Sequence, residues 1–161
     1  MLNILMAIGI AVGLFCVGMA HSAQALSADA EAALKTEKDI YVATKRKSGE
    51  WSKAAPIWFM YDGEALYFTA SPTSYKAKRI KRGSPVKVWV GSPDGPSFTG
   101  KAEIIDDSTI VARMGEVYSQ KYWIAWIGIA RPRVDRVESG KTVAVKVTPL
   151  DEGTDVNAPQ E

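Results

Sequence analysis

Residues 56–83 read PIWFMYDGEALYFTASPTSYKAKRIKRG and predict a β-hairpin that runs directly into a short basic helix. Residues 57–61 and 64–69 are rich in aromatic and β-branched residues, which favour strands. Asp62-Gly63 between them suits a two-residue type I′ turn, in which both central residues have positive φ. We therefore expect these two segments to pair as antiparallel neighbours.

The second half of this stretch predicts a helix whose start can bind an anion. Residues 71–74 (Ser-Pro-Thr-Ser) offer capping hydroxyls and a proline suited to a first helical turn, and Gly83 follows the basic residues 76–82 as a stop. Hydroxyls, backbone N–H groups and lysines thus meet at a strand end, a combination that favours a phosphate. From the residues alone, the commoner explanation of Ser74 and Lys76 is a capping serine and a solvated lysine.

A family resemblance rests on an ordered series of short segments. They are residues 56–59 (PIWF), 62–63 (DG), 66–69 (LYFT), 74–76 (SYK) and 85–90 (PVKVWV). In this order they resemble the flavin-binding core of the pyridoxamine-phosphate-oxidase-like family, a split β-barrel that holds FMN or a deazaflavin. The resemblance covers roughly residues 38–149.

The resemblance implies a mostly β fold, a six-stranded antiparallel split β-barrel with short helices, and a homodimer. Similar proteins place a strand-end hydroxyl and a helix lysine on the flavin phosphate, and the segment at 58–59 along the isoalloxazine edge. Which of those two aromatic residues contacts the ring stays open. The implied cofactor-binding residues are Trp58, Phe59, Thr69, Ser74, Lys76, Lys78 and Arg79.

Length and composition indicate one globular domain. The chain has 161 residues, enough for a single core, and its 47% hydrophobic and 24% charged residues are ordinary for a folded protein. The formal net charge of +2 is too small to predict nucleic-acid binding.

The N-terminal segment predicts export. Residues 4–20 form an uncharged apolar run, and Ala23 and Ala25 after it make an A-x-A cleavage site, although no Lys or Arg precedes the run. The run also has the length of a short transmembrane helix. Cleavage after Ala25 and an uncleaved anchor both stay open, and both predict an exported, periplasmic or membrane-anchored domain. We divide the chain into 1–25 (signal peptide or anchor), 26–37 (linker or short helix), 38–149 (barrel) and 150–161 (loose tail).

The mature domain lacks cysteine and histidine, because Cys16 and His21 both precede the expected cleavage point. This excludes from it disulfides, thiol nucleophiles, Cys/His zinc sites, Ser-His-Asp triads and a histidine-ligated haem. Any chemistry must therefore come from a bound cofactor or from oxygen and amine side chains.

Beyond the hairpin, alternation predicts strands at 39–46, 85–91, 97–105 and 141–148, and Asp106-Asp107-Ser108 predicts the cap of a helix. That helix has a buried stripe made of Ile110, Val111, Met114, Val117 and Tyr118. Residues 122–127 (YWIAWI) need cover by the domain, a second subunit or lipid. Trp89, Tyr122, Trp123 and Trp126 either line a substrate pocket at a dimer seam or belong to a core and interface.

The leading function is an exported FMN-dependent oxidoreductase of unidentified substrate, with the redox chemistry carried by the flavin. The alternative is a non-catalytic split-barrel binding or assembly module at the membrane. A deazaflavin in place of FMN is a variant of the first, and haem binding is a weaker one because the usual ligand is missing. No catalytic side chain and no metal site follows from the sequence.

Overall fold

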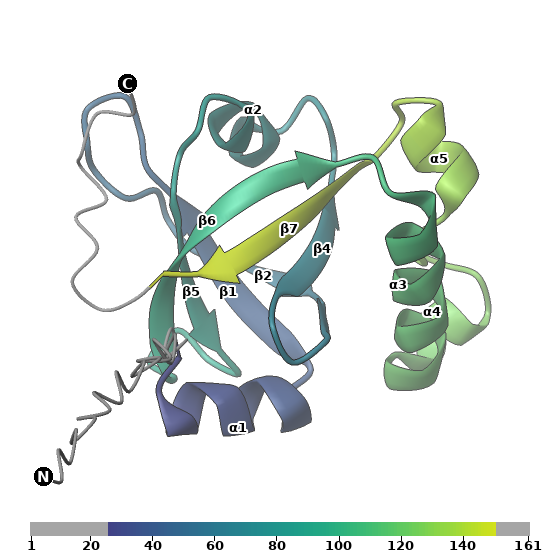
Figure 1. Cartoon of the computed structure of the whole chain (residues 1–161), viewed down its shortest axis with the longest axis horizontal. Helices are drawn as coiled ribbons and strands as arrows, with labels where there is room; N and C mark the ends of the chain where they lie inside the picture. The colour runs from purple at the N-terminus through teal and green to yellow at the C-terminus, as the bar shows by residue number, and fades with distance from the viewer. Residues whose placement is uncertain (1–25, 151–161) are drawn as a thin grey trace, which may run out of the picture.

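A computed structural model describes residues 26–150, which form an antiparallel sheet curled into a nearly closed barrel with short helices around it (Figure 1). The strands are β1 (Asp39–Thr44), β2 (Ala55–Trp58), β3 (Met60–Tyr61), β4 (Leu66–Ala70), β5 (Val86–Val90), β6 (Ser97–Ile105) and β7 (Val143–Pro149). The helices are α1 (Ala28–Thr36), α2 (Tyr75–Lys81), α3 (Ser108–Lys121), α4 (Trp123–Trp126) and α5 (Val134–Glu138).

The sheet has seven strands in the order β2-β1-β5-β6-β7-β4-β3, where six were predicted. The additional strand arises because residues 55–61 do not run as one strand. Residues 55–58 pair with β1, residues 60–61 pair with β4, and Phe59 lies between the two ladders. The two outermost strands of the sheet are therefore joined through one residue, which brings the open edges together and nearly closes the barrel. Pro56 lies on the outermost strand, as its missing donor predicts.

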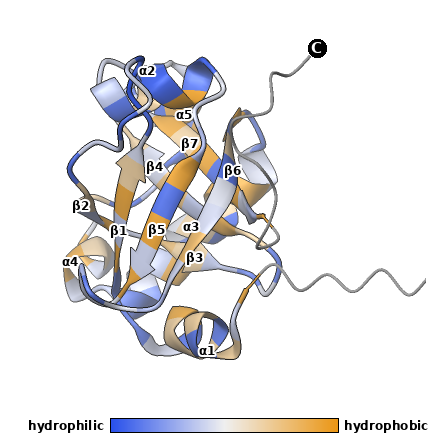
Figure 2. Cartoon of the chain, turned by 90° about the vertical axis from the view of Figure 1, so that its left-hand side faces the viewer, coloured by the Kyte–Doolittle hydropathy of each residue, from blue (hydrophilic) through white to orange (hydrophobic). Residues whose placement is uncertain are grey.

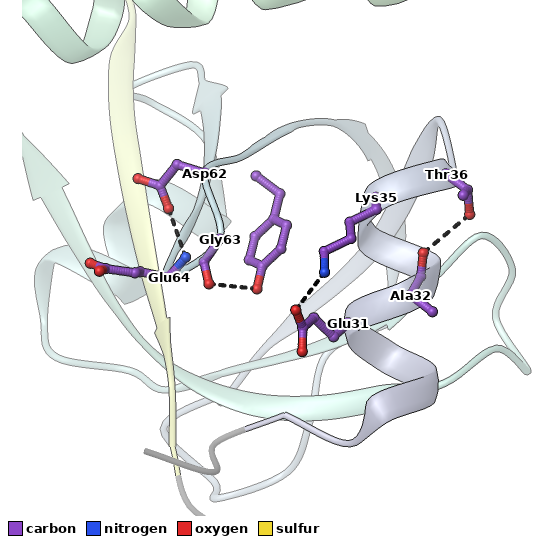
Figure 3. Close-up of polar contacts among 8 residues, drawn as sticks. Glu31, Ala32, Lys35, Thr36, Asp62, Gly63 and Glu64 are labelled. Carbon is purple, nitrogen blue, oxygen red and sulfur yellow. Dashed lines mark hydrogen bonds and ion pairs between the residues drawn. The ribbon is translucent and has the colours of Figure 1, made fainter. Parts of the chain in front are cut away.

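The loop between β3 and β4 differs from the predicted two-residue turn. Met60 pairs with Tyr67 and Tyr61 with Leu66, so residues 62–65 form a four-residue loop. The Asp62 carboxylate accepts a hydrogen bond from the Glu64 backbone N–H at 3.0 Å (Figure 3). It accepts a second one from the Ala65 backbone N–H at 2.8 Å. An aspartate that bonds its own following backbone stabilises a wider loop, and this competes with the type I′ turn.

Two hydrophobic clusters form the core, one inside the barrel and one between the barrel and α3. Alternation along β4 separates them, because Leu66 and Phe68 belong to the inner cluster and Tyr67 to the outer one. In β5 the three valines are buried and Lys87 and Trp89 are partly exposed, as the sequence predicted. Figure 2 shows the apolar residues along the strands and the hydrophilic ones on the turns and on α2.

Several predicted elements are confirmed. Residues 28–36 are helical rather than a linker, and Ser27 caps them by accepting from the Ala30 N–H. Asp107 caps α3, on which Val111, Met114 and Tyr118 are buried. The two short helices α4 and α5 were not predicted. The export segment 1–25 and the tail from 151 lie outside the described residues. None of the helices between residues 26 and 150 has the length and apolarity to span a bilayer.

Candidate functional site

Two tyrosine hydroxyls, one from Tyr118 of α3 and one from Tyr122 at its C-terminal cap, hold the chain where it changes from β2 to β3. The Tyr122 hydroxyl accepts from the Phe59 N–H at 3.1 Å and donates to the Lys38 carbonyl at 2.6 Å. The Tyr118 hydroxyl donates to the Trp58 carbonyl. Backbone groups between two ladders lose their sheet partners, and these hydroxyls replace them. Residues 58–59, which the resemblance places along a flavin ring, are thus held in a defined conformation.

Trp58 and Phe59 point in opposite directions. Phe59 is fully buried in the inner cluster, whereas Trp58 is partly exposed and stacks on Tyr122, with ring centroids 4.3 Å apart and planes 8° from parallel. The Tyr118 ring packs edge to face on the Trp58 ring, with the two ring centroids 6.3 Å apart. Of the two predicted aromatic residues, only Trp58 therefore presents its side chain at the surface.

Lys121 is a residue of this region that sequence reasoning missed. Its Nζ lies 3.5 Å from the centroid of the Phe59 ring and 5.6 Å from that of Tyr122. Burial lowers the pKa of Lys121 to about 8, against the opposing effect of Asp39 and Glu37. The spacing 118, 121 and 122 on one helix face is the signal that would have grouped it with the tyrosines.

The second group of predicted residues surrounds α2. Ser74 caps this helix: its hydroxyl accepts from the Ala77 N–H at 3.2 Å and donates to the Ser71 carbonyl at 2.7 Å. Thr69 is partly buried in β4, opposite Ala144 of β7, and Lys78 is exposed. The capping interpretation of Ser74 is therefore confirmed, and the helix begins where the sequence predicted.

Lys76 is the most unusual residue of this group. It is partly buried, its Nζ lies 5.9 Å from the centroid of the Phe68 ring, and burial lowers its pKa to about 8. Within residues 26–150 no carboxylate lies within 4.0 Å of its ammonium. Removing a charged group from water without a counter-ion is costly, so this cation is suited to an anionic ligand.

Arg79 leaves α2 toward β1, whereas Lys76 leaves it toward β4. The Arg79 guanidinium donates to the Thr44 hydroxyl at 3.2 Å and lies 5.5 Å from the centroid of the Tyr75 ring. It borders an open cavity of about 180 Å³ that is lined by Lys45, Arg46, Lys47, Arg79, Arg82, Gly83 and Ser84. Arg79 thus belongs to a basic surface on the β1 side of α2, and the structure does not bring it together with Lys76.

The structure connects the two groups through the core, because Phe59 and Phe68 belong to the same inner cluster. It does not gather the four aromatic residues that the sequence set beside a pocket. Tyr122 is buried, Trp123 and Trp126 are 74% and 75% exposed, and Trp89 lies on β5 with Lys87 5.0 Å from its ring centroid.

Residues 26–152 match the family model of pyridoxamine 5'-phosphate oxidase. An F420 reductase structure is 27% identical at a TM-score of 0.53, with 74% of this chain and 92% of that one covered. No curated protein matches the chain.

Two further solved structures share the fold at lower identity. HutZ, the haem storage protein of Vibrio cholerae, is 11% identical at a TM-score of 0.57 and covers 76% of this chain and 88% of its own. An FAD and haem binding protein of Mycobacterium smegmatis is 23% identical at a TM-score of 0.52, and the match covers 76% of this chain and 65% of that one.

Proposed function

Because the chain belongs to the pyridoxamine 5'-phosphate oxidase family, we propose that it binds FMN and works as an oxidoreductase. Relatives of this fold are named for a deazaflavin reductase activity, for FAD and haem binding and for haem storage. The family thus supports a flavin-type ligand, and the residues of this chain support the choice of FMN.

The observation that carries the proposal is the unpaired ammonium of Lys76. Among the described residues it has lost water without gaining a carboxylate, and Lys76 is the second residue of α2. A phosphate there gains a charge-assisted hydrogen bond and removes the cost of the isolated charge. Thr69 lies near the end of β4 and Ser74 caps α2. Lys78 is exposed and Arg79 leaves the helix toward β1, so these two enter the proposed site only through the family resemblance.

The Trp58–Phe59 segment has the properties needed beside a flavin ring. Its backbone is held by Tyr118 and Tyr122, and Trp58 offers a flat, partly exposed face. A bound flavin supplies hydride or electron transfer, while these side chains orient it and restrict water. Lys121, with its lowered pKa, can hold or release a proton near this segment at mildly alkaline pH.

The residue content favours a flavin over haem. Residues 26–150 contain neither histidine nor cysteine, the usual strong haem ligands, since the chain's single His and Cys are His21 and Cys16. A deazaflavin remains the variant of the proposal, because its phosphate would use the same lysine.

A flavin titration of the purified full chain tests the proposal. We expect a yellow protein with absorbance near about 370 and 450 nm, and tighter binding of FMN than of riboflavin, which lacks the phosphate. Equal affinity for FMN and riboflavin contradicts the phosphate site. No flavin binding at all leaves α2 a solvated basic helix on a protein that works through partners.

We also propose that the domain acts outside the cytoplasm. The support is the apolar run at 4–20 with its A-x-A site. N-terminal sequencing of protein from soluble and membrane fractions separates cleavage after Ala25 from an anchor. A wholly cytoplasmic chain that retains Met1 would contradict both.

A further inference from the structure

We propose that the segment from Trp123 to Ile129 is a docking surface for an anionic lipid membrane. This proposal is independent of the proposed flavin site. It starts from the burial pattern of α4, in which the small Ala125 is buried, Ile124 is partly buried and both tryptophans are exposed. Trp123, Trp126 and Ile127 are 74%, 75% and 53% exposed, and Ala125 is fully buried.

The exposed side chains form one face. Positions 123, 126 and 127 have the i, i+3, i+4 spacing of neighbours on a helical surface. Ile129, 57% exposed, follows in a loop where Gly128 and Ala130 both have positive φ, at 88° and 57°. Positive φ is unfavourable for alanine, so this loop holds a strained backbone while it presents Ile129 to solvent.

The segment that bears this apolar face is anchored to the domain at both of its ends. Tyr122, the residue before it, is buried and bonded to the Lys38 carbonyl and the Phe59 N–H. On its other side the chain packs closely on α3: a Cβ on Gly115 would lie 2.8 Å from the Pro132 carbonyl. The large apolar side chains are therefore displayed by a well-anchored segment.

The excess of basic residues around the apolar face favours an anionic partner. Residues 117–134 contain no acidic residue, and residues 121–141 contain five basic residues against two acidic ones. Arg131 and Arg133 follow the apolar face and are exposed, although Arg133 also pairs with Asp135 at 2.9 Å. Tryptophan and isoleucine beside arginine is the composition that favours the headgroup region of an anionic bilayer.

A second copy fits this face less well. A whole aromatic side chain has roughly 150–250 Å² of surface, so the exposed parts of Trp123, Trp126, Ile127 and Ile129 sum to roughly 500 Å². A stable interface buries roughly 800 Å² per partner, which is more than this face offers. A two-fold dimer through this face would also bring the same arginines toward one another.

The apolar face lies on the same part of the molecule as the end of α1. The hydrogen bond from Tyr122 to Lys38 places the start of α4 beside the residues that follow α1. Figure 1 shows α1 at the lower side of the molecule, toward which the C-terminal end of α3 also points. The apolar face therefore lies near the C-terminal end of α1.

The test uses the full chain with Trp51→Phe and Trp89→Phe, which leaves three emitting residues: Trp58, stacked on Tyr122, and the exposed Trp123 and Trp126. It is mixed with vesicles of brominated phosphatidylcholine with or without about a third phosphatidylglycerol. We expect quenching that strengthens on the order of tenfold in apparent affinity with the anionic lipid. Residues 4–20 contain no tryptophan, so quenching reports contact by the domain.

Adding Ile127→Asp and Ile129→Asp should abolish the quenching. Ile104→Asp, at an exposed isoleucine of β6, is the matched control and should leave it intact. Circular dichroism checks that each variant is folded. The proposal is overturned if the chain shows no quenching, if the aspartate pair is quenched like its parent, or if tryptophan emission shifts to the blue with protein concentration in the absence of lipid. The comparison of vesicles decides the question even if the aspartate pair does not fold.

Discussion

Lys76 is the residue on which the proposed phosphate site depends. Lys76→Ala should weaken FMN binding roughly 10- to 150-fold, the equivalent of about 1.5–3 kcal/mol for a charge-assisted contact. Ser74→Ala should weaken it less, because the serine hydroxyl is engaged in the helix cap. The exposed Lys81, beyond the first turn, provides the control Lys81→Ala, which should bind FMN like the parent. A Lys76→Ala variant of unchanged affinity, measured by quenching of flavin fluorescence, would show that no phosphate is bound here.

The lowered pKa of Lys76 predicts a pH dependence with a definite sign. The folded chain releases the proton near pH 8, but the unfolded chain keeps it up to the ordinary value of 10.5. Between these values the unfolded state binds more protons, so this residue makes stability rise with pH. In denaturant titrations, Lys76→Met should therefore be more stable than the parent below pH 8, and the difference should shrink above it. FMN affinity should fall over the same window, while riboflavin affinity stays constant.

At the scale of elements, the link between α3 and the strand break depends on Tyr122. Tyr122→Phe removes the hydroxyl that serves the Phe59 N–H and the Lys38 carbonyl, and should cost about 1–3 kcal/mol of unfolding free energy. Tyr75→Phe is the control, since Tyr75 is 77% exposed. Urea titrations of both variants measure the difference. Equal midpoints would mean that water satisfies these groups without the tyrosine.

Gly115 tests how closely the chain after α4 packs on α3. In an exposed helix interior, Gly→Ala stabilises by about 1 kcal/mol. Here the new methyl group would meet the Pro132 carbonyl at 2.8 Å, so Gly115→Ala should instead destabilise, by about 1–3 kcal/mol. The exposed Gln120→Ala on the same helix should change little. A stabilised Gly115→Ala variant in thermal unfolding would contradict the tight packing.

At the scale of the whole molecule, the homodimer implied by the family resemblance stays a prediction. Light scattering should give twice the monomer mass. Since we assign the Trp123–Ile129 segment to lipid, the dimer must use another surface, and Ile127→Asp with Ile129→Asp should leave that mass unchanged. Loss of the dimer in this variant would assign the segment to a subunit interface.

The sequence by itself determined where most strands and helices lie and which of their side chains face the core. The valines of β5 alternate, Asp107 and Ser74 cap helices, and residues 97–105 form β6 at the predicted bounds, because periodicity and capping are local properties. The family of the chain was also identified from its short segments, and the family model confirms it.

Tertiary structure alone decided what depends on contacts distant in sequence. The break at Phe59 exists because β1 and β4 compete for one strand, and tyrosines about 60 residues away stabilise it. Whether Lys76 lacks a counter-ion and whether Trp126 is buried depend on which groups the fold brings near them. Periodicity indicates that an apolar side chain needs cover, but only the packed chain shows that α4 turns its two tryptophans outward.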